Sequence, residues 1–275
     1  MMIDAKHAKW ARGAAAAGAF LALVYAISAR LSLGSSAESA IRISFGLAGF
    51  GIFVFECLLT LRKRYRASLA GRLQTWLRAH IWLGLLSFLL VLMHSGFRWG
   101  SGLAAVLMWL LSIVVVSGMS GVAFQHYLPR LMKELVEKET VVQQIPNVIG
   151  KLRTDADRAR RLNGVLMGAD AKQILDSRFE YAIGPYLQEH PPASSMKTFG
   201  SRKSIEDYFG DWCRAMPPAA QTTLKTLEDI CEERRQLAVQ RKLHGLLHSW
   251  LLVHVPLSFG LLGLTAIHAV LALRY

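Results

Sequence analysis

The sequence contains few cysteines and lacks a nucleotide-binding motif. Its three cysteines, Cys57, Cys213 and Cys231, form no CxxC pair and no CxxCH site. These absences exclude an iron–sulfur cluster and a covalently attached c-type haem. No GxGxxG run occurs, and the polar central region has too few strand-like segments for a Rossmann domain.

Charged residues are also scarce. They make up 19% of the chain, against 53% hydrophobic residues, and they gather in short clusters and in one long polar block. Between them lie five stretches that approach the ~20 apolar residues needed to span a bilayer. These stretches are residues 14–33, 43–61, 81–97, 103–122 and 246–273. The sequence thus predicts an all-α, polytopic membrane helix bundle of five transmembrane helices with a helical insert.

The basic residues lie on one side of this predicted topology. They precede the first stretch, fill the connection between the second and third, and flank the block between the fourth and fifth: Lys6, Lys9, Arg12, Arg62, Lys63, Arg64, Arg66, Arg72, Arg78, Arg130, Lys133, Arg241 and Lys242. The positive-inside bias places these connections and the N-terminus in the cytoplasm and the C-terminus outside, as in a bacterial cytoplasmic membrane. The third and fifth stretches are then parallel.

The first apolar stretch resembles a signal peptide, but its apolar run is long, so we expect an uncleaved anchor.

The net charge of +13 is explained by these membrane-edge clusters. Their expected partner is membrane lipid with anionic headgroups, and nucleic acid is not expected. The predicted domains are transmembrane helices 1–4 (residues 1–124), a cytoplasmic α-helical insert (125–242) and transmembrane helix 5 (243–275). The last helix is expected to begin near residue 219. A basic patch in the insert could dock an acidic electron donor or form a solvated face near lipid: Arg153, Arg158, Arg160 and Arg161.

Four histidines in the apolar stretches share one spacing. His80, directly before the third stretch, and His94, within it, are fourteen residues apart, and His254 and His268 are fourteen apart in the fifth. On a helix, this spacing separates two side chains by ~21 Å along the axis and only ~40° around it. His254 follows His80 by 174 residues, and His268 follows His94 by the same number. Two parallel helices can therefore bring together an inner pair, His80 with His254, and an outer pair, His94 with His268.

Polar side chains inside a bilayer are unfavourable and tend to mark functional paths. Two imidazoles from facing helices suit a six-coordinate haem iron, so the two pairs predict two haem b groups. Four glycines near the pairs would remove side-chain bulk: Gly84, Gly96, Gly260 and Gly263. Arg78 and Arg98 could pair with the inner and outer propionates. Glycine within membrane helices and arginine at their ends are also common for structural reasons.

The pattern His80-X13-His94 and His254-X13-His268 resembles the cytochrome b superfamily. It is most similar to the transmembrane domain of ferric reductases and NADPH oxidases, chiefly through LRAHIWLGLLSFLLVLMHSGFRWG (77–100) and HSWLLVHVPLSFGLLGLTAIHAVLALRY (248–275). The resemblance implies transmembrane electron transfer through two b haems, with the four histidines as axial ligands. Those families usually continue into a flavin and nicotinamide domain, whereas this chain stops at Tyr275. We therefore expect electrons from quinol or from a separate cytochrome or iron–sulfur protein.

Other interpretations remain open at this stage. The chain could act as a subunit of a larger redox system or could itself reduce iron or a similar outer acceptor. It could also be a haem-free transporter or scaffold that uses the histidines for metal or proton handling, although no clear repeat is visible. His126, His244 and His248 could bind a metal, relay protons beside a quinone site, or form hydrogen bonds at the headgroups. Glu56 could carry a quinol proton or pair with a neighbouring arginine such as Arg62.

Overall fold

The computed structural model describes residues 5–30, 35–65, 72–137, 139–163 and 168–274. These residues are mostly helical and contain no strand, which confirms the predicted all-α fold. The chain divides into two compact units. Met1–Tyr127 and Leu247–Tyr275 form one, here called the membrane unit, and Leu128–Leu246 forms the other, here called the helical unit. Each unit is described separately below.

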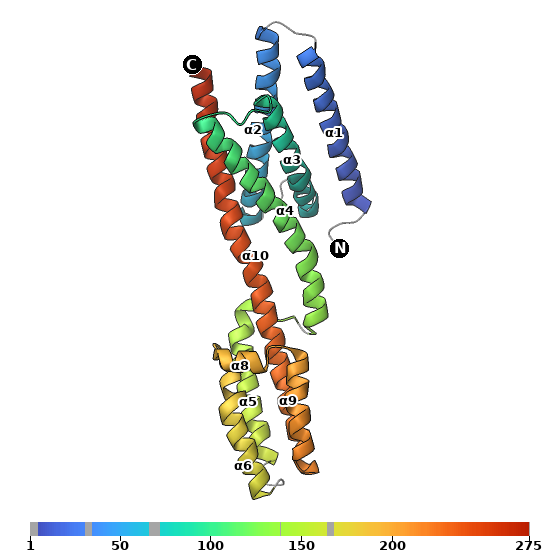
Figure 1. Cartoon of the computed structure of the whole chain (residues 1–275), viewed down its shortest axis with the longest axis vertical. Helices are drawn as coiled ribbons and strands as arrows, with labels where there is room; N and C mark the ends of the chain where they lie inside the picture. The colour runs from blue at the N-terminus through green and yellow to red at the C-terminus, as the bar shows by residue number, and fades with distance from the viewer. Residues whose placement is uncertain (1–4, 31–34, 66–71, 138, 164–167, 275) are drawn as a thin grey trace. The chain divides into compact units, whose positions relative to one another are not determined.

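In the described part of the chain, five helices are long and apolar enough to cross a membrane, as the sequence predicted, and the chain is an integral membrane protein. They are α1 (Ala5–Arg30), α2 (Ser35–Tyr65), α3 (Leu73–His94), α4 (Leu103–Leu135) and α10 (Gln221–Arg274) (Figure 1). Pro129 lies inside α4 and Pro256 inside α10, and neither ends its helix. Proline is tolerated within membrane helices because neighbouring groups satisfy the backbone atoms that it frees.

Within the membrane unit, α2 and α1 both pack against α3. Phe45, Leu90 and Met93 are buried where these helices meet. Gly49 allows close packing, because a Cβ there would lie 3.3 Å from Cγ2 of Val91 on α3. Large apolar side chains face outward from the same helices, as a surface in contact with lipid requires.

The helical unit has a core of its own. It contains α5 (Ile145–Asn163), α6 (Ala169–Arg178), α7 (Gly184–Tyr186), α8 (Ala193–Thr198) and α9 (Arg202–Ala215), together with the first part of α10. A π-helical turn at Phe179–Ile183 joins α6 to α7, and short 3₁₀ turns cover Val142–Gln144 and Pro218–Ala220. The largest fully buried side chains include Trp212, Tyr186, Phe199 and Phe209. The Tyr186 hydroxyl donates to the Phe199 carbonyl at 3.3 Å, and burial raises the pKa of this tyrosine, which keeps it protonated.

The sequence predicts Arg160 in a basic patch on the surface, whereas the structure places its side chain among other residues of the helical unit. Its side chain is only 17% exposed and lies over the Phe179 ring. The guanidinium is within 3.4–3.7 Å of the carboxylates of Asp157, Asp176 and Glu180. A cation that is surrounded by three carboxylates holds α5 to the neighbouring segment and is not available to a partner.

Candidate functional site

Among the described residues of the membrane unit, two cavities are each lined by one histidine from α3 and one from α10. The first cavity, of about 180 Å³, is lined by His80 and His254. The second, of about 480 Å³, is lined by His94 and His268. The structure therefore brings together in one cavity the two members of each pair that the equal sequence offsets predicted. The linings of both cavities are mainly apolar, as expected for a cofactor site inside a bilayer.

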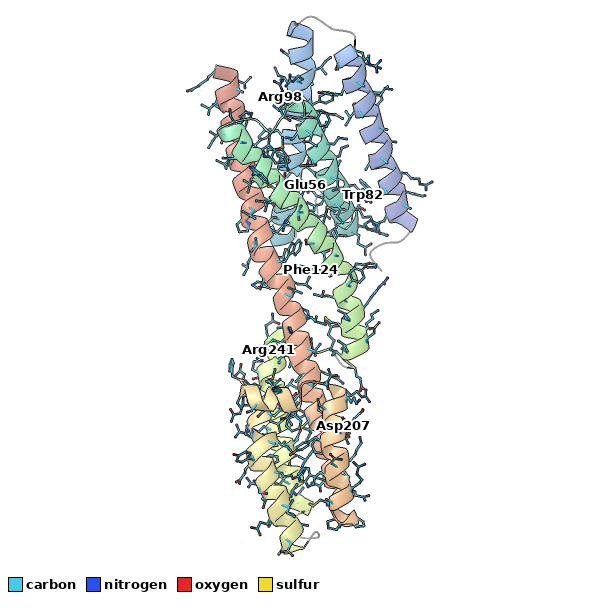
Figure 2. The ribbon with its side chains drawn as sticks, in the orientation of Figure 1. Glu56, Trp82, Arg98, Phe124, Asp207 and Arg241 are labelled. Carbon is cyan, nitrogen blue, oxygen red and sulfur yellow. The ribbon has the colours of Figure 1, made fainter. Side chains whose placement is uncertain are left out.

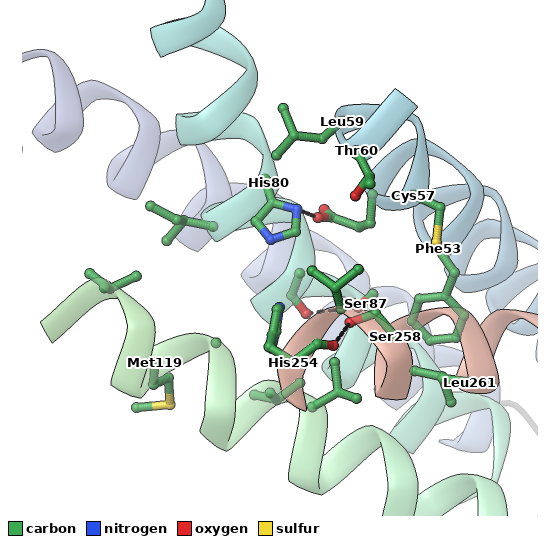
Figure 3. Close-up of a pocket in the computed structure, with 18 of the residues that line it drawn as sticks. Phe53, Cys57, Leu59, Thr60, His80, Ser87, Met119, His254, Ser258 and Leu261 are labelled. Atoms are coloured by element: carbon green, nitrogen blue, oxygen red, sulfur yellow. Dashed lines mark hydrogen bonds and ion pairs between the residues drawn. The ribbon is translucent and has the colours of Figure 1, made fainter. Parts of the chain in front are cut away.

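The inner pair is held in a defined orientation. The ring centroids of His80 and His254 lie 6.3 Å apart at an interplanar angle of 82°. Figure 3 shows the two side chains pointing toward one another in the first cavity. Nδ1 of His80 contacts the carboxylate of Glu56 on α2, and Nδ1 of His254 is 3.2 Å from Oγ of Ser117 on α4. Nε2 of each ring is left as the nitrogen that can bind a ligand.

Trp250 supports His254 from one turn earlier on α10. Its indole stacks on the imidazole with 5.2 Å between centroids and an interplanar angle of 23°. The indole Nε1 donates to the carbonyl of Ser117 at 2.9 Å. Gly121 leaves room for this ring, because a Cβ on that residue would overlap the indole. Two helices thus fix one imidazole by stacking and by hydrogen bonding.

In the outer pair, a backbone carbonyl holds the ring of His94. Nδ1 of His94 is 2.8 Å from the carbonyl oxygen of Arg42 on α2, so this nitrogen carries the proton and donates. The Arg42 Nε in turn donates to the His94 carbonyl at 3.3 Å. A Cβ at Gly46 would lie 2.7 Å from His94 Nδ1, so the absence of a side chain there lets the ring lie against α2. His268 lines the same cavity from α10.

The predicted glycines have different environments. Gly84 lines the first cavity, and a Cβ there would have open space for at least 4 Å. Gly260 and Gly263 also face open space, but neither lines a cavity. Gly96 has a φ of +64° in the turn after α3, a conformation that glycine adopts readily, and it lies beside Arg42. Of the four, Gly84 is therefore the one that adds to the space around a pair.

The two predicted arginines also differ. Arg98 lines the second cavity together with His94 and His268. Arg78 lies half-buried on α3 and is not among the residues that line either cavity. Figure 2 shows Arg98 near one end of the membrane unit and Glu56 farther inside it. A positive side chain therefore borders the cavity of the outer pair, whereas the first cavity is bordered by a carboxylate.

Sequence reasoning missed the residues that hold the rings, although a signal was present for some. Ser117 and Gly121 are four residues apart on α4, the small-xxx-small spacing that permits close helix contact. Trp250 precedes His254 by four residues, a spacing at which side chains on a helix meet. Glu56 was considered for a quinol proton or an arginine partner, and the structure places its carboxylate against His80.

The remaining histidines lie outside the two cavities. His126 packs edge-on against Tyr127 with 5.1 Å between centroids, and His248 is exposed. His244 Nε2 is 3.9 Å from a carboxylate oxygen of Glu139 within the helical unit. Among the residues that the structure describes, no three His, Cys, Asp or Glu side chains gather into a site for a bare metal ion.

The two cavities share one layer of their linings. Phe53 from α2, Leu111 from α4 and Leu261 from α10 line both, and all three are buried. They form a single hydrophobic cluster to which α3 contributes Phe88 and Val91. An apolar layer from four helices therefore lies between the inner and outer pairs.

The chain matches no protein-family model, no curated protein and no solved structure. Four imidazoles in two pairs, inside a membrane, offer nitrogen ligands to two separate groups.

We expect Gly46→Ala to destabilise the protein, because its Cβ would push against the His94 ring. Overpacking of this kind typically lowers stability by about 1–3 kcal/mol. Thermal unfolding of the purified protein in detergent should show a lower melting temperature. Gly51→Ala on the same helix is the matched control, because a Cβ at Gly51 meets nothing within 4 Å and should leave stability unchanged or slightly raised. Equal melting temperatures for the two variants would contradict the packing of His94 against α2.

Proposed function

We propose that this chain is a transmembrane electron-transfer protein that binds two haem b groups, one in each cavity. The axial ligands are His80 and His254 in the first cavity and His94 and His268 in the second. The observation that carries the proposal is the presence of two separate apolar cavities, each with one histidine from α3 and one from α10. Polar side chains inside a membrane are unfavourable unless they have a function or a partner, and these four histidines occur in matched pairs.

The geometry of the inner pair supports a shared metal. Metal–imidazole bonds are about 2 Å long, so two rings on opposite sides of one metal have centres about 6 Å apart. The observed separation is 6.3 Å. Both Nδ1 atoms have protein partners, the arrangement by which metal-bound histidines are usually oriented. Gly84 lines the same cavity, and a Cβ there would meet nothing within 4 Å, which leaves space beside α3 for a bound group.

Haem b bound in this way would supply one carrier of a single electron at each site. With two histidines from the protein to hold it, a haem iron would have no place left for a substrate. The linings are mainly apolar, and Arg98, which lines the second cavity, would be available to pair with a propionate there. The residues therefore favour electron transfer over catalysis at the iron.

We further propose that the N-terminus and the helical unit are cytoplasmic and that the C-terminus is outside, in a membrane such as the bacterial cytoplasmic membrane. The support is the concentration of lysine and arginine in the connections on one side of the membrane helices. The inner pair then lies toward the cytoplasm. The proposed partners are quinol or a separate redox protein on one face and an electron acceptor or donor on the other.

Measurement of haem content tests the proposal. We expect the purified protein to show a b-type α-band in its reduced-minus-oxidised spectrum and close to two haems per chain. His94→Leu and His268→Leu should each remove the same haem and retain the other, because both histidines line the second cavity. His80→Leu and His254→Leu should remove the other one.

His126→Leu is the matched control, since this histidine also belongs to the membrane unit but lines neither cavity. It should retain both haems. Protein that folds without haem would exclude electron transfer as proposed and would favour a haem-free transporter or scaffold. Loss of both haems from every histidine variant would contradict the pairing.

The orientation can be tested by labelling at Tyr181, whose side chain in the helical unit is 91% exposed. A Tyr181→Cys variant, made together with Cys213→Ser, leaves Cys57 and Cys231, which are both buried. A membrane-impermeant maleimide should label this variant in inverted vesicles and not in right-side-out vesicles. Labelling in right-side-out vesicles alone would reverse the proposed topology.

A further inference from the structure

The two histidine pairs differ in the charge beside them. In the first cavity, Nδ1 of His80 contacts the carboxylate of Glu56, whose side chain is 12% exposed. In the second cavity, Nδ1 of His94 meets a neutral backbone carbonyl, and Arg98 adds a positive side chain to the lining. Among the residues that the structure describes, no aspartate or glutamate lines the second cavity. The two sites therefore share the same kind of ring but differ in the charged side chain that lines the cavity, Glu56 in the first and Arg98 in the second.

We propose that Glu56 is a positioning residue that makes the two haem sites electrochemically unequal. This inference rests on the proposed function, because it presupposes that His80 is an axial ligand. A carboxylate that accepts a hydrogen bond from Nδ1–H fixes the ring so that Nε2 faces the cavity, and it raises the basicity of Nε2. A more basic ligand and a nearby negative charge both stabilise the oxidised, more positive form of a metal.

The low dielectric of the site strengthens this effect. Charges interact several times more strongly in a protein interior than in water, and Glu56 is mostly removed from solvent. Ser117, the partner of His254, is a neutral hydroxyl and does not offset the charge. The reduced form is therefore less stable at the inner pair than at the outer pair. At the outer pair, the positive charge of Arg98 stabilises the reduced form.

Substitutions at Glu56 can separate the effect of its charge from the effect of its hydrogen bond. Glu56→Gln keeps an oxygen that can accept from Nδ1 but removes the negative charge. Glu56→Leu removes both, and the loss of such a partner typically weakens metal binding by about 10- to 100-fold. Glu56→Asp keeps the charge on a shorter side chain. Ser117→Ala is a matched control, because it removes the neutral partner of the opposite ligand without changing any charge.

The test is a redox titration of the purified full-length protein, followed by its visible spectrum. Glu56→Gln is combined with His268→Leu, which leaves only the inner site intact, and separately with His254→Leu, which leaves only the outer site. We expect Glu56→Gln to raise the midpoint potential in the first background and to leave it unchanged in the second. Ser117→Ala should shift the inner potential less than Glu56→Gln does, and Glu56→Asp should keep the inner potential close to that of the native residue.

The outcomes separate this inference from the function on which it rests. If the wild-type protein binds no haem, the proposed function itself is contradicted. Two haems in the wild type, together with an inner potential that Glu56→Gln does not change, overturn the role of Glu56 alone. If Glu56→Gln loses the inner haem, Glu56→Asp decides: retention of that haem supports a need for the charge. Its loss from both variants shows that only packing at Glu56 matters and overturns the proposal.

Discussion

The arrangement of the membrane unit depends on one requirement: a ring nitrogen inside a membrane needs a partner from the protein. A buried polar group left unpaired costs about 1–3 kcal/mol, and lipid offers no replacement. The helices α3 and α10 carry the histidines, but the partners of His80, His94 and His254 come from α2 and α4. Glu56, the Arg42 carbonyl and Ser117 therefore engage Nδ1 of these three rings and leave Nε2 for a ligand. The scaffold helices are as much a part of the site as the helices that bear the imidazoles.

The same four helices keep the two cavities apart. Phe53, Leu111 and Leu261 form an apolar layer between the inner and outer pairs. Such a layer excludes water and ions, and a protein that passes electrons across a membrane has to be closed to both. The two histidine pairs are otherwise similar, and the carboxylate of Glu56 lies beside the inner pair only. Glu56 is thus the residue that we propose makes the redox potentials of the two sites unequal.

The all-α fold and the five apolar helices could be predicted because long apolar runs have few other structures. The joint lining of each cavity by His80 with His254, and by His94 with His268, follows the equal sequence offsets. The partners of the rings could not be predicted, since they depend on how α2 and α4 are rotated about their axes, and membrane helices are apolar on every face. Gly46 shows the limit: its importance comes from a ring on another helix, and nothing near it in the sequence indicates that contact.

The central claim is that both axial positions at each site are filled by histidine. It is tested most directly by the low-temperature electron paramagnetic resonance spectrum of the oxidised, purified protein. Two low-spin ferric signals of comparable intensity are predicted, one from each cavity. A dominant high-spin signal would contradict the claim, because it would show an iron with an axial position that no histidine fills.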